Sequence, residues 1–401
     1  MKIGIIKEGK IPPDSRAPLV PGQCRFIMDN FPIELAVQRS PIRSYRDEEF
    51  EKEGLTMTDD LTGCDVLLGV KEVPVNMLIP EKTYFFFSHT IKKQPHNRRL
   101  LQAVLEKHIR LIDYELLTDD QGVRLIAFGR FAGMVGAHNA LFTYGERTGR
   151  LSLKRMRDCH DYEEAKSIYR NTRFPPLKVV VTGGGRVGSG ACQVLQDMGF
   201  KRVSPSDFLF GYYNYPVFTQ LNPEQYAARK DGRFFIPQHY YDHPEEFHSA
   251  FFPYAQVADI FINGIFYDRR APAFFTVEER RKPEFHIQVI ADVTCDIAPH
   301  SSVPSTIRAS TIDSPVYGFD PVSHSETQPY QDGIIDIMAI DNLPNEMPRD
   351  ASLAFGQMFV DKILPELLNP QSKVIERATI AAHGHLTPHF MYLQDYVAGD
   401  L

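Results

Sequence analysis

Short apolar runs recur along the first 130 positions of the chain, and stretches with helical spacing separate several of them. The helix-like stretches include 46–53 and 97–107. Strands that alternate with helices are typical of a mostly parallel sheet, so the pattern predicts an α/β unit. The predicted strands are 2–6, 34–38, 66–70, 84–87, 110–113 and 124–128.

A second α/β pattern starts with the β-branched run 178–182, which leads into a glycine loop. Gly183, Gly185 and Gly188 fill a G-x-G-x-x-G pattern, and an amphipathic helical stretch follows. Strand, glycine turn and helix in this order indicate a dinucleotide site, because the glycines let backbone N–H groups approach a pyrophosphate. Since the loop lies in mid-chain, we expect a whole domain to precede it and to supply the chemistry.

The rest of the pattern indicates how the two parts are connected. An Ala-, Gly- and Phe-rich helix from 129 to about 144 is expected to cross between domains, and the helix 352–368 is expected to return to the first one. The stretch 207–254 is crowded with Tyr, Phe and His, so we predict an insertion packed by its own aromatic residues. Further strands are expected at 258–264, 287–292 and 335–340.

Composition and charge narrow the function classes. The net charge of −7 argues against nucleic acid as a partner, since phosphate binding favours a basic face. No apolar run approaches the ~20 residues that span a bilayer, and no signal peptide is predicted. Five scattered cysteines without a C-x-x-C pair favour reduced thiols and a cytoplasmic location. His383, His385 and His389 fit no common ligand spacing, so no metal site is predicted.

Polar residues directly follow three apolar runs of the first domain. Lys71-Glu72, Ser88-His89 and Asp113-Tyr114-Glu115 stand where ligands bind in open α/β sheets, beyond the carboxyl ends of strands. Lysine and histidine suit proton transfer, although Lys71 as base and Lys71 as electrostatic anchor both stay open. Arg16 is expected either to hold a substrate carboxylate or to form a surface salt bridge.

Several of these segments together resemble a known family. The segments are 16–19, 70–72, 82–92, 110–115, 123–129, 261–265, 291–293, 340–344 and 354–356. The chain resembles the lysine–2-oxoglutarate reductase module of aminoadipic semialdehyde synthase, a relative of L-lysine-forming saccharopine dehydrogenase and, more distantly, of alanine dehydrogenase and transhydrogenase. The resemblance implies an α/β fold of two Rossmann-like domains with a cleft between them. A catalytic domain (1–134 and 345–401) would then enclose a dinucleotide domain (135–344) with the insertion at about 207–254.

The resemblance also implies a reaction and a set of residues. The ε-amine of lysine would condense with the keto group of 2-oxoglutarate, and a nicotinamide would reduce the imine to saccharopine, or the reverse. Lys71 and His89 would be the acid–base pair, Glu72 and Glu115 the neighbouring carboxylates, and Arg16 and Lys92 the anchors for substrate carboxylates. The residues expected near the cofactor are Gly183, Gly185, Arg186, Val187, Gly188, Ser204, Asn263 and Asp341, the last at the domain junction.

Two alternatives stay open beside this hypothesis. One is an alanine dehydrogenase-like enzyme for another amine and keto acid, against which the block 85–92 favours the lysine branch. The other is a dinucleotide-binding sensor without catalysis, which we expect to have lost Lys71 or His89, and both are present. Because the sequence ends near residue 400, we expect the saccharopine-splitting enzyme to be a separate protein.

The choice of coenzyme is predicted from the strand after the glycine helix. An acidic residue about 20 positions past the loop binds the ribose 2′-hydroxyl of NAD. Ser204 takes that place here, with Lys201 and Arg202 just before it. A serine tolerates a 2′-phosphate that a carboxylate would repel, so NADP(H) is favoured. NAD(H) stays open because Asp207 lies close by.

Overall fold

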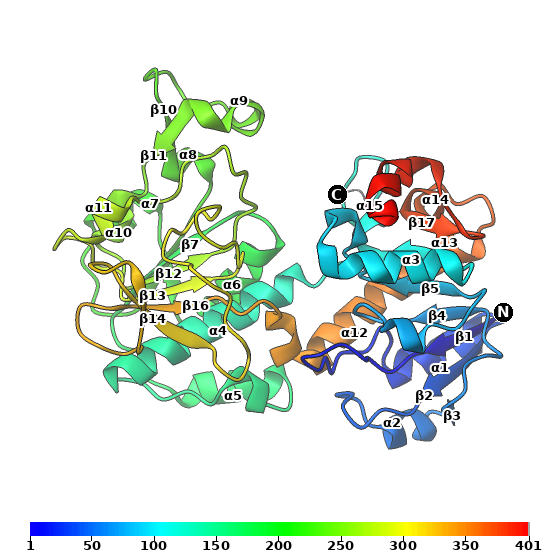
Figure 1. Ribbon diagram of the computed structural model, residues 1–401. Helices are drawn as coiled ribbons and strands as arrows, with labels where there is room; N and C mark the ends of the chain where they lie inside the picture. Colours follow the sequence, from blue (N-terminus) through cyan, green and yellow to red (C-terminus); the bar gives the residue numbers. More distant parts are fainter. Residues whose placement is uncertain (400–401) are drawn as a thin grey trace. The chain divides into compact units, whose positions relative to one another are not determined.

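The computed structural model describes residues 1–399, which fold into two compact units (Figure 1). Unit 1 contains residues 1–128 and the chain from Pro348 onward, and unit 2 contains residues 129–347. The predicted domain boundaries lie a few residues away from these. The difference arises because the long helix α4 (Gly129–Thr148) starts directly at the boundary and packs along its length on elements of unit 2.

Unit 1 is built on one eight-stranded sheet in the order β18-β17-β6-β5-β4-β1-β2-β3. Its six parallel strands are β1 (Lys2–Ile5), β2 (Glu34–Gln38), β3 (Thr56–Thr58), β4 (Val66–Leu68), β5 (Thr83–Phe86) and β6 (Arg110–Asp113). The antiparallel strands β17 (Thr379–Ala382) and β18 (His385–Leu386) extend it. The helices are α1 (Pro21–Asn30), α2 (Asp47–Lys52), α3 (Arg98–Glu106), α12 (Pro348–Met358), α13 (Leu364–Leu368), α14 (Lys373–Ala378) and α15 (Gln394–Ala398).

One predicted strand of unit 1 is wrong. Residues 124–128 form only an isolated bridge between Arg124 and Thr118. Phe128, at the end of this stretch, stacks on Phe355 with ring centroids 4.4 Å apart. An aromatic contact with α12 therefore takes the place of sheet pairing.

Unit 2 is built on a second eight-stranded sheet in the order β15-β14-β16-β13-β12-β7-β9-β8. Its parallel strands are β7 (Lys178–Thr182), β8 (Lys201–Arg202), β9 (Val217–Leu221), β12 (Ile260–Asn263), β13 (Val289–Asp292) and β16 (Ile335–Met338), and β14 (Val316–Asp320) and β15 (Ser325–Thr327) are antiparallel. The helices besides α4 are α5 (Tyr162–Asn171), α6 (Arg186–Asp197), α7 (Pro205–Phe210), α8 (Pro223–Tyr226), α9 (Pro237–Asp242), α10 (Phe252–Ala255) and α11 (Val277–Arg280). The two predicted α/β patterns are confirmed.

Two glycines bring α4 and α6 into close contact. A Cβ atom on Gly133 of α4 would lie 1.8 Å from the carbonyl oxygen of Val187. A Cβ atom on Gly190 of α6 would lie 2.0 Å from the carbonyl oxygen of Arg130. Only glycine fits at both positions, so α4 braces the helix that follows the glycine loop.

The predicted aromatic insertion is wrong at its start. Strand β9 lies inside the stretch 207–254, yet it pairs in parallel with β7 in the main sheet. Phe208, Phe251 and Tyr254 share one buried cluster with sheet residues such as Phe261. Aromatic residues on both sides of β9 therefore belong to the core of unit 2. Only the pair β10 (Ala227–Arg229) and β11 (Phe247–Ser249) forms a small separate sheet, which projects with α9 in Figure 1.

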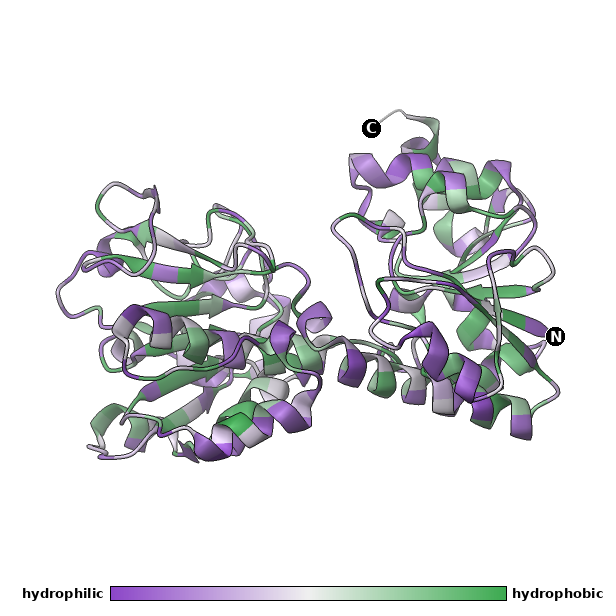
Figure 2. Ribbon diagram, turned by 90° about the horizontal axis from the view of Figure 1, so that it is seen from below, coloured by the Kyte–Doolittle hydropathy of each residue, from purple (hydrophilic) through white to green (hydrophobic). Residues whose placement is uncertain are grey.

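Apolar residues concentrate in the strands of both sheets, whereas much of the helical surface is polar (Figure 2). Among residues 1–399, no helix is both long and apolar enough to cross a bilayer. The cytoplasmic location stays a prediction.

Candidate functional site

The carboxyl ends of β4 and β5 bring three of the predicted residues together in unit 1. Lys71 and Glu72 follow β4, and His89 follows β5. Nδ1 of His89 lies 2.5 Å from Oε1 of Glu72, and Nζ of Lys10 lies 3.0 Å from the other oxygen, Oε2. A carboxylate only accepts, so Nδ1–H is the donor. No partner of Nε2 is found among the described residues, which leaves this nitrogen able to exchange a proton.

Glu72 is held as a carboxylate. Burial acts to raise its pKa, but the hydrogen bond and charge of His89, together with Lys10, outweigh burial and lower the pKa to about 2. The carboxylate fixes the tautomer and orientation of His89 at every pH near neutrality. Glu72 therefore has the role of a positioning residue beside His89.

The ammonium group of Lys71 is destabilised by its surroundings. Burial is the largest cause, the charges of Arg16 and Lys10 add to it, and the pKa falls to about 8. The charges of Asp14 and Glu72 act in the opposite direction. A lysine with this pKa releases its proton close to neutral pH, as a general base requires. This environment suits the first of the two alternatives that the sequence left open, and the role of Lys71 as base stays a prediction.

Glu8 is a site residue that the sequence analysis missed. Its carboxylate is buried and accepts from the backbone N–H groups of Val70 at 2.7 Å and Lys71 at 2.9 Å. Burial and the charge of Asp14 raise its pKa to about 7. Glu8 therefore fixes the turn that carries Lys71. The rule applied to β4 and β5 would have found it, since Glu8 follows β1 at the same edge of the sheet.

Arg16 is an interior residue rather than part of a surface salt bridge. Its Nε and Nη2 donate to the two oxygens of Asp14 at 2.9 and 2.6 Å, and its guanidinium lies 4.3 Å from the centre of the Phe128 ring. Both side chains are buried. Two donors of the guanidinium are thus engaged by Asp14, and its charge acts on Lys71.

Glu115 bonds to other side chains than those of Lys71 and His89. Arg124 donates to its Oε1 at 2.9 Å, and Nζ of Lys92 lies 3.7 Å from its Oε2. Its backbone N–H donates to buried Asp113, which also accepts from the backbone N–H and hydroxyl of Ser88. The predicted residues therefore form two groups, one of Lys71, Glu72 and His89, the other of Glu115 and Lys92 with Arg124.

In unit 2 the glycine loop has the geometry of a phosphate cradle. Gly183 has φ of +100°, and a Cβ atom there would lie 2.6 Å from the carbonyl oxygen of Gly264. A Cβ atom on Gly188 would lie 1.9 Å from the carbonyl oxygen of Gly183. Gly185, at the N-cap of α6, has open space instead. The first glycine makes the turn, the second leaves room for a pyrophosphate, and the third allows close packing, so the loop fits a dinucleotide. Arg186 and Val187 supply the first N–H groups of α6.

The side chain of Asn263 is engaged by the protein itself. Its Oδ1 accepts from the hydroxyl of Thr182 at 2.9 Å, and its Nδ2 donates to Asp292 and Ser302, each at 2.9 Å. All four residues are buried. These hydrogen bonds connect the ends of β7, β12 and β13. The amide of Asn263 is therefore bonded within the protein and stabilises the strand that precedes the glycine loop.

Ser204 caps a helix, and the strand before it is not the neighbour of β7, so its contact with the cofactor stays a prediction without the reason first given for it. Its side chain accepts from the N–H of Asp207 at 3.0 Å and caps α7, and its hydroxyl donates to the Asp207 carboxylate at 2.7 Å. Strand β8 pairs with β9 and lies at the sheet edge, while β9 is the strand next to β7. By the rule for doubly wound sheets, the end of β9, near Gln220 and Asn222, is the place where a ribose is expected. The sequence missed it because α7 and its loop separate α6 from β9.

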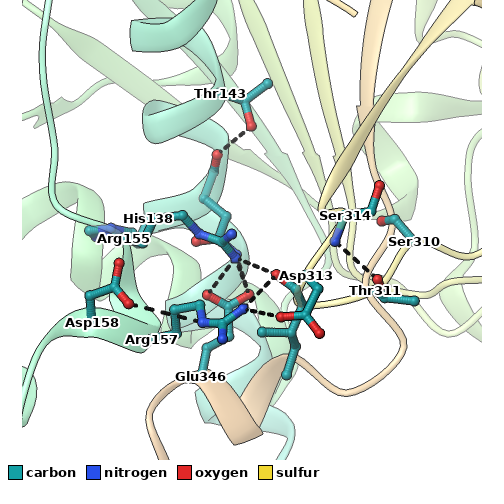
Figure 3. A network of polar contacts seen from close by, with 12 residues as sticks. His138, Thr143, Arg155, Arg157, Asp158, Ser310, Thr311, Asp313, Ser314 and Glu346 are labelled. Carbon is teal, nitrogen blue, oxygen red and sulfur yellow. Dashed lines mark hydrogen bonds and ion pairs between the residues drawn. The ribbon is translucent and has the colours of Figure 1, made fainter. Parts of the chain in front are cut away.

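Asp341 is exposed on the segment that follows β16. The next turn, Leu343–Glu346, is fastened by the buried carboxylate of Glu346, which accepts from Asn139 of α4 at 3.0 Å and from Arg155 at 3.3 Å (Figure 3). Arg155 also donates to the carbonyl oxygen of Ile312 at 2.9 Å. This network holds the segment that carries Asp341 against α4.

A cavity of about 1200 Å³ lies elsewhere in unit 1, at the amino ends of β5 and β6. Lys82, His108 and Arg110 line it together with His383 and His389. It is at the opposite edge of the sheet from Lys71. Among the described residues, no group of three or more histidine, cysteine or acidic side chains is arranged to hold a metal ion.

Several known proteins resemble this chain in sequence, and a solved structure resembles it in fold. Residues 4–135 match the family "Alanine dehydrogenase/PNT, N-terminal domain". The chain is 30% identical to alpha-aminoadipic semialdehyde synthase from Arabidopsis thaliana, over 98% of this chain and 41% of that protein. It is 26% identical to saccharopine dehydrogenase [NAD(+), L-lysine-forming] from Emericella nidulans, over 92% of this chain and 91% of that protein. An L-alanine dehydrogenase structure aligns with a TM-score of 0.67, at 16% identity, over 100% of this chain and 99% of its own.

The chain spans less than half the length of the semialdehyde synthase, so the similarity concerns one part of that protein. The alanine dehydrogenase likeness, at low identity, shows the fold and confirms the predicted two-domain α/β class. The resemblance stated from the sequence is confirmed: the chain is similar over most of its length to one part of alpha-aminoadipic semialdehyde synthase and to L-lysine-forming saccharopine dehydrogenase, and residues 4–135 match the alanine dehydrogenase/PNT N-terminal family.

Proposed function

We propose that this chain interconverts lysine plus 2-oxoglutarate with saccharopine by reduction or oxidation at a C–N bond. The observation that carries the proposal is the arrangement of Lys71, with its pKa lowered to about 8, beside a His89 held by Glu72 at the carboxyl edge of the sheet. Saccharopine and lysine appear in the name of the Emericella nidulans relative, and 2-oxoglutarate is the keto acid that the resemblance of the sequence implies.

The chemistry needs a group that accepts a proton and one that donates a proton. Attack of the ε-amine on the keto carbon forms a carbinolamine, and the amine proton passes to a base, for which neutral Lys71 is suited. Loss of water from the carbinolamine needs a proton on the departing hydroxyl, which His89 supplies from Nε2. A nicotinamide dinucleotide held by the glycine loop would supply the hydride that reduces the imine carbon.

The substrates carry three carboxylates, and positively charged side chains of unit 1 are candidates to bind them. Lys92 is about half exposed, and its 3.7 Å contact with Glu115 is longer than a hydrogen bond, so the ammonium can turn to a substrate carboxylate. Arg16 and Lys10 add positive charge close to Lys71. Lys92 is therefore the anchor that we propose, with Arg16 contributing through its charge.

NADP(H) is favoured as coenzyme. The end of β9 reads Gln220-Leu221-Asn222, so no carboxylate stands at the ribose position. The preference for NADP(H) therefore rests on the end of β9 and no longer on Ser204. NAD(H) is the alternative, and it is the coenzyme in the name of the Emericella nidulans relative.

The test mixes the protein with lysine, 2-oxoglutarate and either NADPH or NADH, and follows the absorbance of the reduced nicotinamide. We expect oxidation that depends on both substrates, with a product of the mass of saccharopine. Oxidation with pyruvate and ammonia, and none with lysine, would instead identify an alanine dehydrogenase-like activity. If the protein binds a nucleotide but turns over neither substrate pair, the remaining alternative is a dinucleotide-binding sensor without catalysis.

A further inference from the structure

We propose that Arg202 binds the 2′-phosphate of NADP(H) and sets the coenzyme preference of unit 2; this rests on the dinucleotide site proposed above. Arg202 is the last residue of the short edge strand β8. Its Nη2 donates to Oε1 of Gln220 at 2.9 Å, and Nε2 of Gln220 donates to the carbonyl oxygen of Gly183 at 2.8 Å. A chain of two hydrogen bonds thus joins this guanidinium to the first glycine of the loop.

The topology puts these residues where the adenosine ribose lies. In doubly wound folds the ribose hydroxyls reach the end of the strand beside the first one, and here that strand is β9. The amide of Gln220 is hydrogen-bonded to Gly183 and Arg202, and the side chain of Leu221 is buried. Asn222 comes within 2.6 Å of a Cβ built on Gly184, so the end of β9 closes directly on the loop.

The charge of Arg202 is uncompensated by the protein. Among the described residues its guanidinium bonds to a neutral amide and forms no ion pair. A guanidinium binds phosphate through parallel N–H donors, whereas a 2′-hydroxyl gives it no charge to neutralise. The preceding residue, Lys201, faces the other way, with Nζ 4.3 Å from the centre of the Tyr215 ring.

One carboxylate offers a rival arrangement. Glu224 lies two residues past Asn222 on the first turn of α8, and its carboxylate forms no hydrogen bond or ion pair among the described residues. If Glu224 turned to the ribose, it would bind the 2′-hydroxyl of NAD(H) and repel a phosphate. The two residues therefore predict opposite coenzymes.

The experiment measures dissociation constants of NADPH, NADH and the probe 2′,5′-ADP by fluorescence or calorimetric titration. Arg202→Ala is expected to weaken NADPH and 2′,5′-ADP by roughly 10- to 100-fold, the range of a charge-assisted hydrogen bond, and NADH by less than about twofold. Arg202→Lys should restore part of the NADPH affinity. The wild-type NADPH affinity should fall with added salt more steeply than that of Arg202→Ala.

Lys201→Ala is the matched control, because it removes the same charge one residue away and should leave the NADPH-to-NADH ratio unchanged. An equal loss of both nucleotides in Arg202→Ala would overturn the proposal, and so would an NADH preference that Glu224→Gln abolishes. If the wild-type protein binds neither nucleotide, the dinucleotide site itself is wrong, which is a different result from an unchanged ratio.

Discussion

The two sheets differ in what they do with the polar residues at their carboxyl ends. In unit 1, Lys71 and Glu8 are charged groups packed into low-dielectric surroundings, and burial is the main cause that moves their pKa values towards neutrality. In unit 2, Thr182, Asn263 and Asp292 bond to one another, and the surface that remains consists of glycine backbone. A polar residue at a strand end is therefore no sign of catalysis by itself.

The carboxyl ends of the two sheets differ in whether neighbouring side chains already bond to the polar groups there. Asn263 has given both N–H donors to protein partners, whereas Nε2 of His89 has no partner among residues 1–399. A saturated network is rigid, which suits a cradle of backbone N–H groups. A strand end with a polar atom that has no protein partner can exchange a proton with a ligand, which suits proton transfer. The predictions below test this division from the largest expected effect to the smallest.

The largest effect is expected from removing the acid or the base. Lys71→Met and His89→Ala should each lower turnover by roughly 10²-fold or more, the usual contribution of a positioned proton donor or acceptor. Steady-state kinetics measure this, and nucleotide titration should show an unchanged NADPH affinity, because the cradle belongs to unit 2.

Lys82→Met and His96→Ala are the matched controls. Lys82 lies at the amino end of β5, at the opposite edge of the sheet, and His96 is exposed. Both should keep wild-type turnover. Near-wild-type rates in Lys71→Met and His89→Ala would remove these residues from the mechanism.

The next effect separates two glycines of the loop. Gly185→Ala places a methyl group in open space, so we expect an unchanged melting temperature and a loss of nucleotide affinity of about tenfold or more. Gly188→Ala forces a methyl group to within 1.9 Å of a backbone oxygen and should lower both.

Thermal denaturation and nucleotide titration check the two glycines together. Gly22→Ala, in α1 of unit 1, has nothing within 4 Å, so it should leave nucleotide affinity unchanged and should not lower the melting temperature, since alanine favours the helix. A loss of stability in Gly185→Ala equal to that in Gly188→Ala would contradict the assignment of Gly185 to the ligand side of the loop.

A smaller effect is expected in the pH profile. With Lys71 as base, kcat/KM for the condensation should rise with pH and level off above about 8. The charge of Glu72 favours the ammonium form of Lys71, so Glu72→Gln should lower its pKa and move this limb to lower pH. Glu115→Gln should leave the limb in place, because Glu115 lies with Arg124 and Lys92. If Glu115→Gln shifted the pH limb and Glu72→Gln did not, Glu115 rather than Glu72 would be the carboxylate that acts on Lys71.

Local pattern was enough to predict the parts of the site that depend on one strand and its end. Lys71 and His89 follow neighbouring parallel strands, β4 and β5, so the strand-end rule brings them together without knowledge of the loops. The glycine turn was predictable for the same reason, since strand, loop and helix are consecutive in the chain.

The parts that depend on loop geometry or strand order were not predictable. The turn after β6 carries Glu115 towards Arg124, which an isolated bridge to Thr118 holds in place. The order of β8 and β9 depends on long-range pairing, and counting residues from the loop selected the edge strand. Side-chain partners such as Asp14 for Arg16 come from folding of an irregular loop, in which no periodicity exists.

The smallest effect tests the revised role of Ser204. Because its side chain caps α7, Ser204→Ala should cost about 1 kcal/mol of unfolding free energy, the usual value for a lost N-cap, and leave the NADPH-to-NADH ratio unchanged. Chemical denaturation and nucleotide titration measure the two quantities. Ser206→Ala, two residues further on and exposed, should change neither. An altered nucleotide ratio in Ser204→Ala, with stability intact, would return the ribose position to β8 and remove the distinction drawn between β8 and β9.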